Sequence, residues 1–266
     1  LRISFLDKDP VRFNSAVASI RIACEERAPD QVGKINFEKT YNEFEPFYRS
    51  SLAYIIIFVS ACLSWLCLAS DSAKFNSKHA TSFRNVAYQL TFIILLAHTF
   101  GLLGRMYIEG RPPVTNLYSS ALFIGWGAVL LCWFTEKYLR LGIASAMGAV
   151  VGCGSLVIAH NLSLDSSLNP TGDTMEMMRA VLDSNFWLAT HVVTVTIGYS
   201  TTFLAGFLGI AYVIHYLLFQ VTTSPNSSGK LSTLLSSSRK QVEKTLGSMI
   251  FGITCFSLFF SLIGTV

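Results

Sequence analysis

The chain has 266 residues, of which 52% are hydrophobic and only 14% are charged. An ordinary soluble domain has about 25% charged residues, and a mean hydropathy of +0.48 leaves too few polar side chains to cover a water-facing surface of this size. These values exclude the soluble globular, disordered and collagen-like classes and indicate an integral membrane protein. The net charge of +4 is too small to indicate nucleic-acid binding.

The first fifty residues differ from the rest, because they have mixed polarity and no long apolar run. A helix is predicted from about Pro10 to Arg27, with Val11, Ala18 and Ile22 on one side. Eight basic and eight acidic residues balance in this segment, which fits a translocated region. We therefore expect residues 1–50 to form an extracytoplasmic N-terminal segment ahead of a membrane domain over 51–266.

Six apolar stretches are long enough to cross a membrane, which takes about 20 residues. They are Ser51–Ala69, Val86–Gly104, Tyr118–Phe134, Leu141–His160, Phe186–Phe219 and Leu246–Val266. None shows barrel-like alternation, so the predicted fold is all-α, a polytopic membrane bundle of six transmembrane helices. At about 51 Å, the fifth stretch exceeds a hydrocarbon core of about 30 Å, so it must tilt or extend past the membrane surface.

Lysine and arginine in the loops predict the orientation. Nine of these residues lie in the loops 70–85, 135–140 and 220–245, against three in the alternate loops 105–117 and 161–185. The first set of loops is therefore predicted to be cytoplasmic. The acidic loop 161–185 and the N-terminal segment are predicted to lie outside.

Histidine in or near a membrane span suggests a functional site. His191 lies near the outer end of the fifth stretch, four residues after Trp187. A neutral imidazole there is suited to ligate a metal such as haem iron, although a Trp–His pair can also serve only as an interfacial anchor. His98 lies deeper in the second stretch, where an interhelical hydrogen bond and a buried haem contact are equal alternatives.

Arg105 and Arg111 lie in a predicted outer loop, against the charge trend, and Pro112-Pro113 stiffens the chain after them. Guanidinium groups held there could pair with external carboxylates in a bidentate manner. The alternative is a salt bridge with Glu109 or with lipid phosphate. The residues alone do not separate these two interpretations.

Three stretches carry a resemblance to a known family: GRPPVTNLYSS at 110–120 followed by IGW at 124–126, FWLATHV at 186–192 followed by Gly198-Tyr199, and YNEFEPFY at 41–48. With them, residues from about 40 to 266 resemble the CcsA/ResC-type cytochrome c assembly proteins, which handle haem in the System II pathway. The family often has Glu at the position of Ser119. Its tryptophan-rich motif W-G-x-x-W-x-W-D follows a span like Leu246–Val266 and is absent here, so we expect the sequence to be a fragment of a longer polypeptide.

The resemblance implies a haem-binding membrane protein of cytochrome c maturation, which exports or presents haem b on the extracytoplasmic side for covalent attachment to apocytochrome c. Haem is then a transported or attached substrate, with His191 as its axial metal ligand and Trp187, Arg105 and Arg111 as further haem-binding residues. The implied partners are apocytochrome c, the lipid bilayer and a ResB-like assembly subunit, separate or fused. The implied location is the bacterial cytoplasmic (inner) membrane.

Catalytic side chains are not required by this function, since the apocytochrome supplies thiols and the haem supplies vinyl groups. The chain resembles a component of a cytochrome c synthase, and this fragment alone is expected to be inactive. Two alternatives remain: a small-solute transporter that uses His98 and the outer arginines as a polar path, and a non-catalytic scaffold of a membrane assembly complex.

Overall fold

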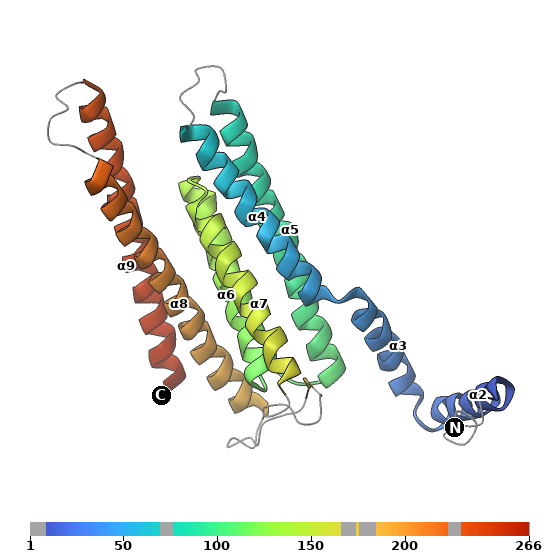
Figure 1. Ribbon diagram of the computed structural model, residues 1–266. Coiled ribbons are helices and arrows are strands. Elements are labelled where there is room, and N and C mark those ends of the chain that lie inside the picture. The colour runs from blue at the N-terminus through green and yellow to red at the C-terminus, as the bar shows by residue number, and fades with distance from the viewer. Residues whose placement is uncertain (1–8, 70–76, 166–173, 176–184, 223–229, 266) are drawn as a thin grey trace. The chain divides into compact units, whose positions relative to one another are not determined.

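The computed structural model describes residues 9–69, 77–165, 174–175, 185–222 and 230–265, and these residues form helices without any strand (Figure 1). The described helices are α2 (Pro10–Arg27), α3 (Pro29–Phe44), α4 (Pro46–Ala69), α5 (Ser77–Glu109), α6 (Leu117–Leu139), α7 (Ile143–Leu164), α8 (Asn185–Thr222) and α9 (Lys230–Thr265). The predicted all-α class is therefore confirmed.

The chain divides into two compact units, Leu1–Pro46 and Phe47–Val266. In the first unit, α2 begins where the carboxylate of Asp9 accepts hydrogen bonds from the backbone N–H groups of Val11 and Arg12, each at 3.1 Å. This N-cap and the proline at the first helical position explain why the helix predicted over Pro10–Arg27 is found with those bounds. The second helix of this unit, α3, was not predicted.

In the second unit, α4 to α9 are long and apolar enough to cross a membrane, and they coincide with the six predicted spans. Several extend beyond the apolar run that predicted them: α5 has 33 residues and α8 has 38. At about 1.5 Å per residue, α8 is far longer than a hydrocarbon core of about 30 Å. The helix must therefore tilt, or its ends must extend beyond the core, as expected.

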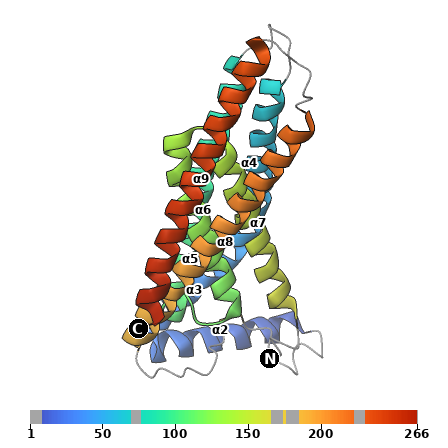
Figure 2. The same cartoon turned by 90° about the vertical axis from the view of Figure 1, so that its left-hand side faces the viewer.

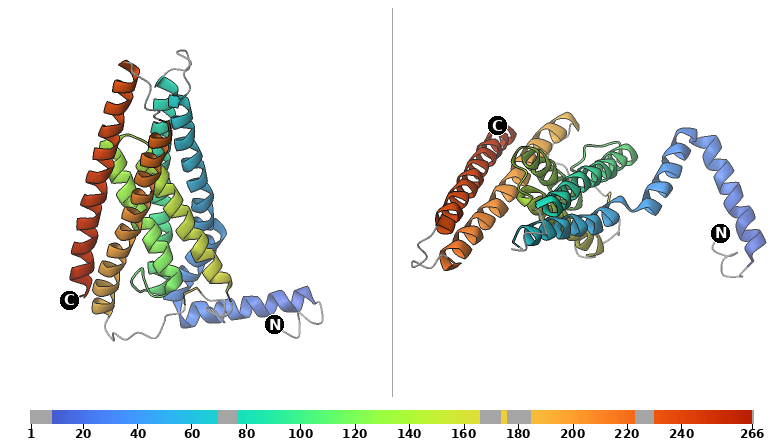
Figure 3. Two further views of the ribbon diagram at one scale, coloured as in Figure 1. Left: turned by 60° about the vertical axis from the view of Figure 1, so that its left-hand side comes forward. Right: turned by 90° about the horizontal axis from the view of Figure 1, so that it is seen from above.

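Helix α6 is the centre of this unit, because α5, α7 and α8 all pack against it, and α9 packs along α8. Seen from above, α8 and α9 form a pair on one side of α6 and α7 (Figure 3). Figure 2 shows the same pair from the side that faces away from α6.

The contact between α6 and α7 is close. A Cβ on Gly148 would lie 2.7 Å from the Cβ of Cys132, and one on Gly152 would lie 2.8 Å from a methyl of Val129. Small residues of this kind bring transmembrane helices together.

Because successive helices run in opposite directions, the end of α5, the start of α6, the end of α7, the start of α8 and the end of α9 lie together. After the predicted orientation, we name this the outer end of the bundle and the opposite one the inner end. Most of the loop 161–185 and parts of the loops 70–85 and 220–245 lie outside the described residues.

Candidate functional site

The stretch GRPPVTNLYSS contains the start of α6, which its own side chains cap. The Asn116 side-chain oxygen accepts from the backbone N–H of Ser119 at 2.8 Å, and the Ser119 hydroxyl oxygen accepts from the N–H of Asn116 at 2.9 Å. That hydroxyl also accepts from the N–H of Thr115 at 2.8 Å. This arrangement is a capping box, in which the third helical residue is usually Glu or Gln. Ser119 therefore takes the place of the usual Glu or Gln in this capping box.

Arg105, near the end of α5, is buried, and other residues of the protein contact its guanidinium group. Its Nη2 lies 2.9 Å from Oε1 of Glu109 and donates to the carbonyl oxygen of Thr174 at 2.8 Å. Nη1 donates to the Thr174 hydroxyl at 3.2 Å, and the guanidinium carbon lies 4.8 Å from the centre of the Tyr118 ring. Of the two interpretations offered by the sequence, the structure shows the ion pair with Glu109.

The same Thr174 carbonyl oxygen accepts from the Asn116 side-chain nitrogen at 2.8 Å. One residue of the loop between α7 and α8 is therefore tied both to the end of α5 and to the start of α6. Arg111, six residues after Arg105, is exposed and beyond the last turn of α5. The two outer arginines thus have different environments, and Arg111 is the one that faces solvent.

His191 and Trp187 are both exposed in the first turns of α8, four residues apart and so on one face of that helix. The next two residues, Val192 and Val193, pack against the core of the bundle, which turns His191 away from it. Trp187 makes an edge contact with Phe186 at 5.4 Å between ring centres. The predicted pair therefore lies at the outer end, with its imidazole open.

The face of α8 that carries His191 is covered by α9 a little farther along. A Cβ on Gly264 would lie 2.9 Å from the backbone nitrogen of Val195, and one on Gly198 would lie 2.5 Å from the hydroxyl of Ser261. The Ser257 hydroxyl donates to the carbonyl oxygen of Gly198 at 2.9 Å. His191 therefore lies one helical turn beyond the last of these contacts, beside the C-terminal end of α9.

The glycines of α8 differ in their surroundings. An added Cβ would meet Ser261 of α9 at Gly198, whereas at Gly206 and Gly209 it would meet nothing within 4 Å among the described residues.

His98 is completely buried, and its Nδ1 lies 3.0 Å from the hydroxyl of Tyr54 on α4. The rings of Phe47 and Tyr54 pack edge-to-face with the imidazole, at 5.7 and 6.2 Å between ring centres. Of the two alternatives left by the sequence, the structure shows the interhelical hydrogen bond.

A metal centre supplied by this chain alone is not found among the described residues, since no three His, Cys, Asp or Glu side chains gather there. A haem iron takes only one or two axial ligands from side chains, and an exposed imidazole such as that of His191 can supply one.

One structurally important residue was missed from the sequence: Glu136, in the last turn of α6 at the inner end. This residue is 2% exposed. It accepts from the backbone N–H groups of Gly142 at 2.6 Å, Ala144 at 3.1 Å and Ser145 at 3.3 Å. Gly142 has no side chain to cap α7 and has a left-handed φ of 78°, so Glu136 caps the next helix in its place. The available signal was the short stretch between two apolar runs, in which an acidic residue lies within seven residues of a glycine.

Comparisons with known proteins find sequence similarity to cytochrome c biogenesis proteins, although no protein-family model matches the chain. Protein NrfI of Wolinella succinogenes is 26% identical over 178 residues, which are 66% of this chain and 18% of NrfI. The CcsA proteins of Chlorella vulgaris and Prochlorococcus marinus (strain NATL1A) are each 27% identical, over 179 and 205 residues.

Those two alignments cover 66% and 73% of this chain, and 52% and 58% of the CcsA proteins. The chain thus spans little more than half the length of these relatives. The resemblance predicted from the three motifs is confirmed: the chain is related in sequence to the CcsA-type cytochrome c biogenesis proteins.

Proposed function

We propose that the protein acts in cytochrome c maturation by holding haem at the outer end of its membrane bundle for attachment to apocytochrome c. The relatives named as cytochrome c biogenesis proteins support the general role. The observation that carries the finer proposal is the exposed imidazole of His191, one helical turn beyond the α8–α9 contact. Haem, as haem b, is the substrate in this proposal.

His191 serves as one axial ligand of the haem iron, and Trp187 on the same helical face lies against the macrocycle. In the family, the tryptophan-rich motif follows a span like α9, whose C-terminal end contacts α8 through Gly264 and Val195. A segment that continues from α9 would therefore emerge beside His191, where it could supply the other face of the site. Axial ligation by imidazole would also fix the position of the iron in the site.

The test is His191→Gly in the full-length gene product, with His160→Gly as the matched control. His160 is also an exposed histidine at the outer end, near the C-terminus of α7. The His191 variant should lose the haem absorption of the purified protein and mature cytochrome c in cells, and added imidazole should partly restore both. The His160 variant should retain them.

An unshifted haem spectrum at full occupancy in His191→Gly would contradict the ligand assignment and leave His191 as an interfacial anchor. Equal loss in both variants, without recovery by imidazole, would contradict it as well.

Arg111 is the residue that we propose pairs with a haem propionate, because Arg105 is already paired with Glu109. Arg111→Gln should lower haem retention at normal protein levels. Arg111→Lys should restore it only in part, since a point charge does not reproduce the guanidinium fork. Unchanged haem content in both variants would assign Arg111 a structural role.

The location completes the proposal: a bacterial cytoplasmic membrane, with residues 1–50 outside, working with a ResB-like subunit. In a cysteine-free protein, Leu164→Cys at the end of α7 should react with a membrane-impermeant maleimide in intact cells, whereas Lys240→Cys near the start of α9 should not. Both positions are exposed. The opposite labelling pattern would refute the orientation and, with it, the placement of the haem site.

A further inference from the structure

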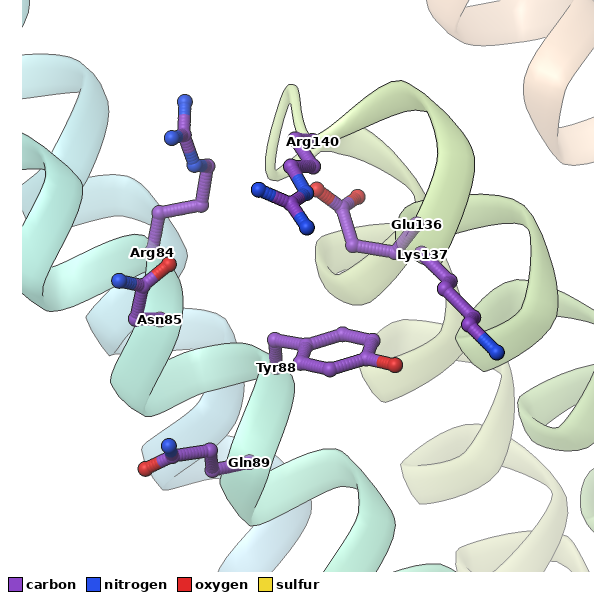
Figure 4. Close-up of a pocket in the computed structure, with 7 residues that line it drawn as sticks. All are labelled: Arg84, Asn85, Tyr88, Gln89, Glu136, Lys137 and Arg140. Carbon is purple, nitrogen blue, oxygen red and sulfur yellow. The ribbon is translucent and has the colours of Figure 1, made fainter.

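The inner end of the bundle holds a pocket of about 350 Å³ between the first turns of α5 and the last turn of α6 (Figure 4). Its lining residues are Arg84, Asn85, Tyr88, Gln89, Glu136, Lys137 and Arg140. In the close-up, the side chains of Arg84 and Arg140 extend from the two sides into the space between the helices, with the Tyr88 ring below them. The haem proposal uses none of these residues.

Charge is unbalanced in this pocket. It contains three cationic side chains and one carboxylate, and the carboxylate of Glu136 already accepts three backbone N–H groups from the start of α7. The Nε of Arg84 is buried without a hydrogen-bond partner. A buried donor left unpaired is costly unless a ligand or water accepts from it. The pocket therefore favours an oxyanion, which guanidinium groups bind well.

An aromatic strip leads away from the cations along α5. The Tyr88 ring stacks on Trp133 at 5.8 Å with an 8° angle between planes, and Phe92 stacks on the same indole at 5.0 Å. Phe92 lies one helical turn closer to the middle of α5 and is 41% exposed. A ligand with its anionic head among the arginines would thus have an apolar surface for the rest of its body.

We propose that this pocket binds the oxyanion head of an amphiphile, a phosphate or carboxylate group attached to an apolar body. Two sources share this chemistry: the phosphate of an anionic phospholipid and the carboxylates of a porphyrin. The pocket volume lies at the lower end of the range for small-molecule sites, about 300–1,000 Å³, and accommodates the head and its nearest apolar atoms. Binding here does not depend on the haem role of His191.

The experiment uses the purified full-length protein in a neutral detergent with two pairs of probes. Dioleoyl phosphatidylglycerol is compared with dioleoyl phosphatidylcholine by counting bound lipids in native mass spectra. Protoporphyrin IX is compared with its dimethyl ester by quenching of tryptophan fluorescence. At least one acidic probe should bind tenfold or more tightly than its neutral counterpart, and the pair that shows the difference identifies the source.

Two variants and a control assign that preference to the pocket. Lys137→Gln and Arg140→Asn each remove one charge at an exposed position, and asparagine tolerates the left-handed φ of 51° at residue 140. Together they should weaken the acidic probe at least tenfold. Lys78→Gln removes a charge from an exposed position on the same α5, outside the pocket, and should leave binding unchanged.

Equal binding of acidic and neutral probes, or equal weakening by Lys78→Gln, would overturn the proposal. Unfolding temperatures of the variants within a few degrees of the parent would show that a lost preference reflects the pocket and not the fold. If the double variant unfolds early, Lys137→Gln alone decides the outcome by weakening, or not weakening, the acidic probe.

Discussion

Removing the carboxylate of Glu136 should loosen the α6–α7 pair, because three backbone N–H groups at the start of α7 lose their acceptor. A typical hydrogen bond contributes about 1 kcal/mol, bonds to charged groups contribute more, and a buried orphaned donor costs about 1–3 kcal/mol. Glu136 is 2% exposed, so water replaces few of the lost hydrogen bonds. For Glu136→Ala we expect about 3 kcal/mol, which corresponds to a factor of roughly 150 in the opening equilibrium.

Cys132, one turn before Glu136, makes this loss measurable. It is 1% exposed and packs against Gly148 of α7, so a thiol reagent reaches it only when α6 and α7 separate. In a protein that keeps this cysteine alone, labelling that is slow relative to reclosing follows the opening equilibrium. The maleimide labelling rate should therefore rise by about two orders of magnitude in Glu136→Ala.

Two controls bracket the result. Glu136→Gln keeps one acceptor oxygen but loses the charge, so its labelling rate should fall between those of the parent and Glu136→Ala. Lys137→Ala changes an exposed neighbour on the same turn and should label like the parent. A parental labelling rate in Glu136→Ala would refute the reasoning, because it would mean that the start of α7 does not need this carboxylate.

The remaining predictions concern packing and capping, and unfolding temperature in detergent checks each of them. Gly152→Ala should cost about 1–3 kcal/mol, because its Cβ would lie 3.0 Å from the ring of Tyr54, whereas Gly154→Ala, with nothing within 4 Å, should be neutral. Tyr54→Phe should cost about 1–3 kcal/mol by leaving Nδ1 of His98 without its partner, and His98→Phe added to it should cost less than the two separate losses combined. Ser119→Ala should lower stability by about 1 kcal/mol through the lost capping box, and Ser119→Glu should recover most of it.

Hydropathy predicted the six spans well because the lipid core selects long apolar runs, but it does not record where a helix ends in water. For α5 the apolar run covers Val86–Gly104, while the helix covers Ser77–Glu109. The added turns carry Arg84 and Arg105, which the helix holds at its two polar ends. Helix α3 was missed for a related reason: its residues have mixed polarity and include Gly33, so no pattern marked them.

Site residues were predicted less completely, because their partners are distant in sequence. Nothing in the sequence joins His98 to Tyr54, 44 residues earlier, or Arg105 to Thr174, 69 residues later. The local pair of Arg105 and Glu109 was foreseeable as one of two alternatives, since residues four apart on a helix are neighbours. His191 is exposed in the first turns of α8, close to the start of the apolar run that predicted this span.

The contact between α8 and α9 sets an axial register as well as a packing distance. The hydrogen bond from Ser257 to the carbonyl oxygen of Gly198 pairs one residue of each helix, and Thr202 bonds the same hydroxyl. Sliding α9 by one residue, about 1.5 Å, would break these bonds where no water replaces them and would push a side chain against the backbone of Val195. The distance between His191 and the C-terminal end of α9 can therefore change only if α9 shifts by a whole residue, which costs these hydrogen bonds. Substitutions in this contact would thus change that distance in steps of one residue.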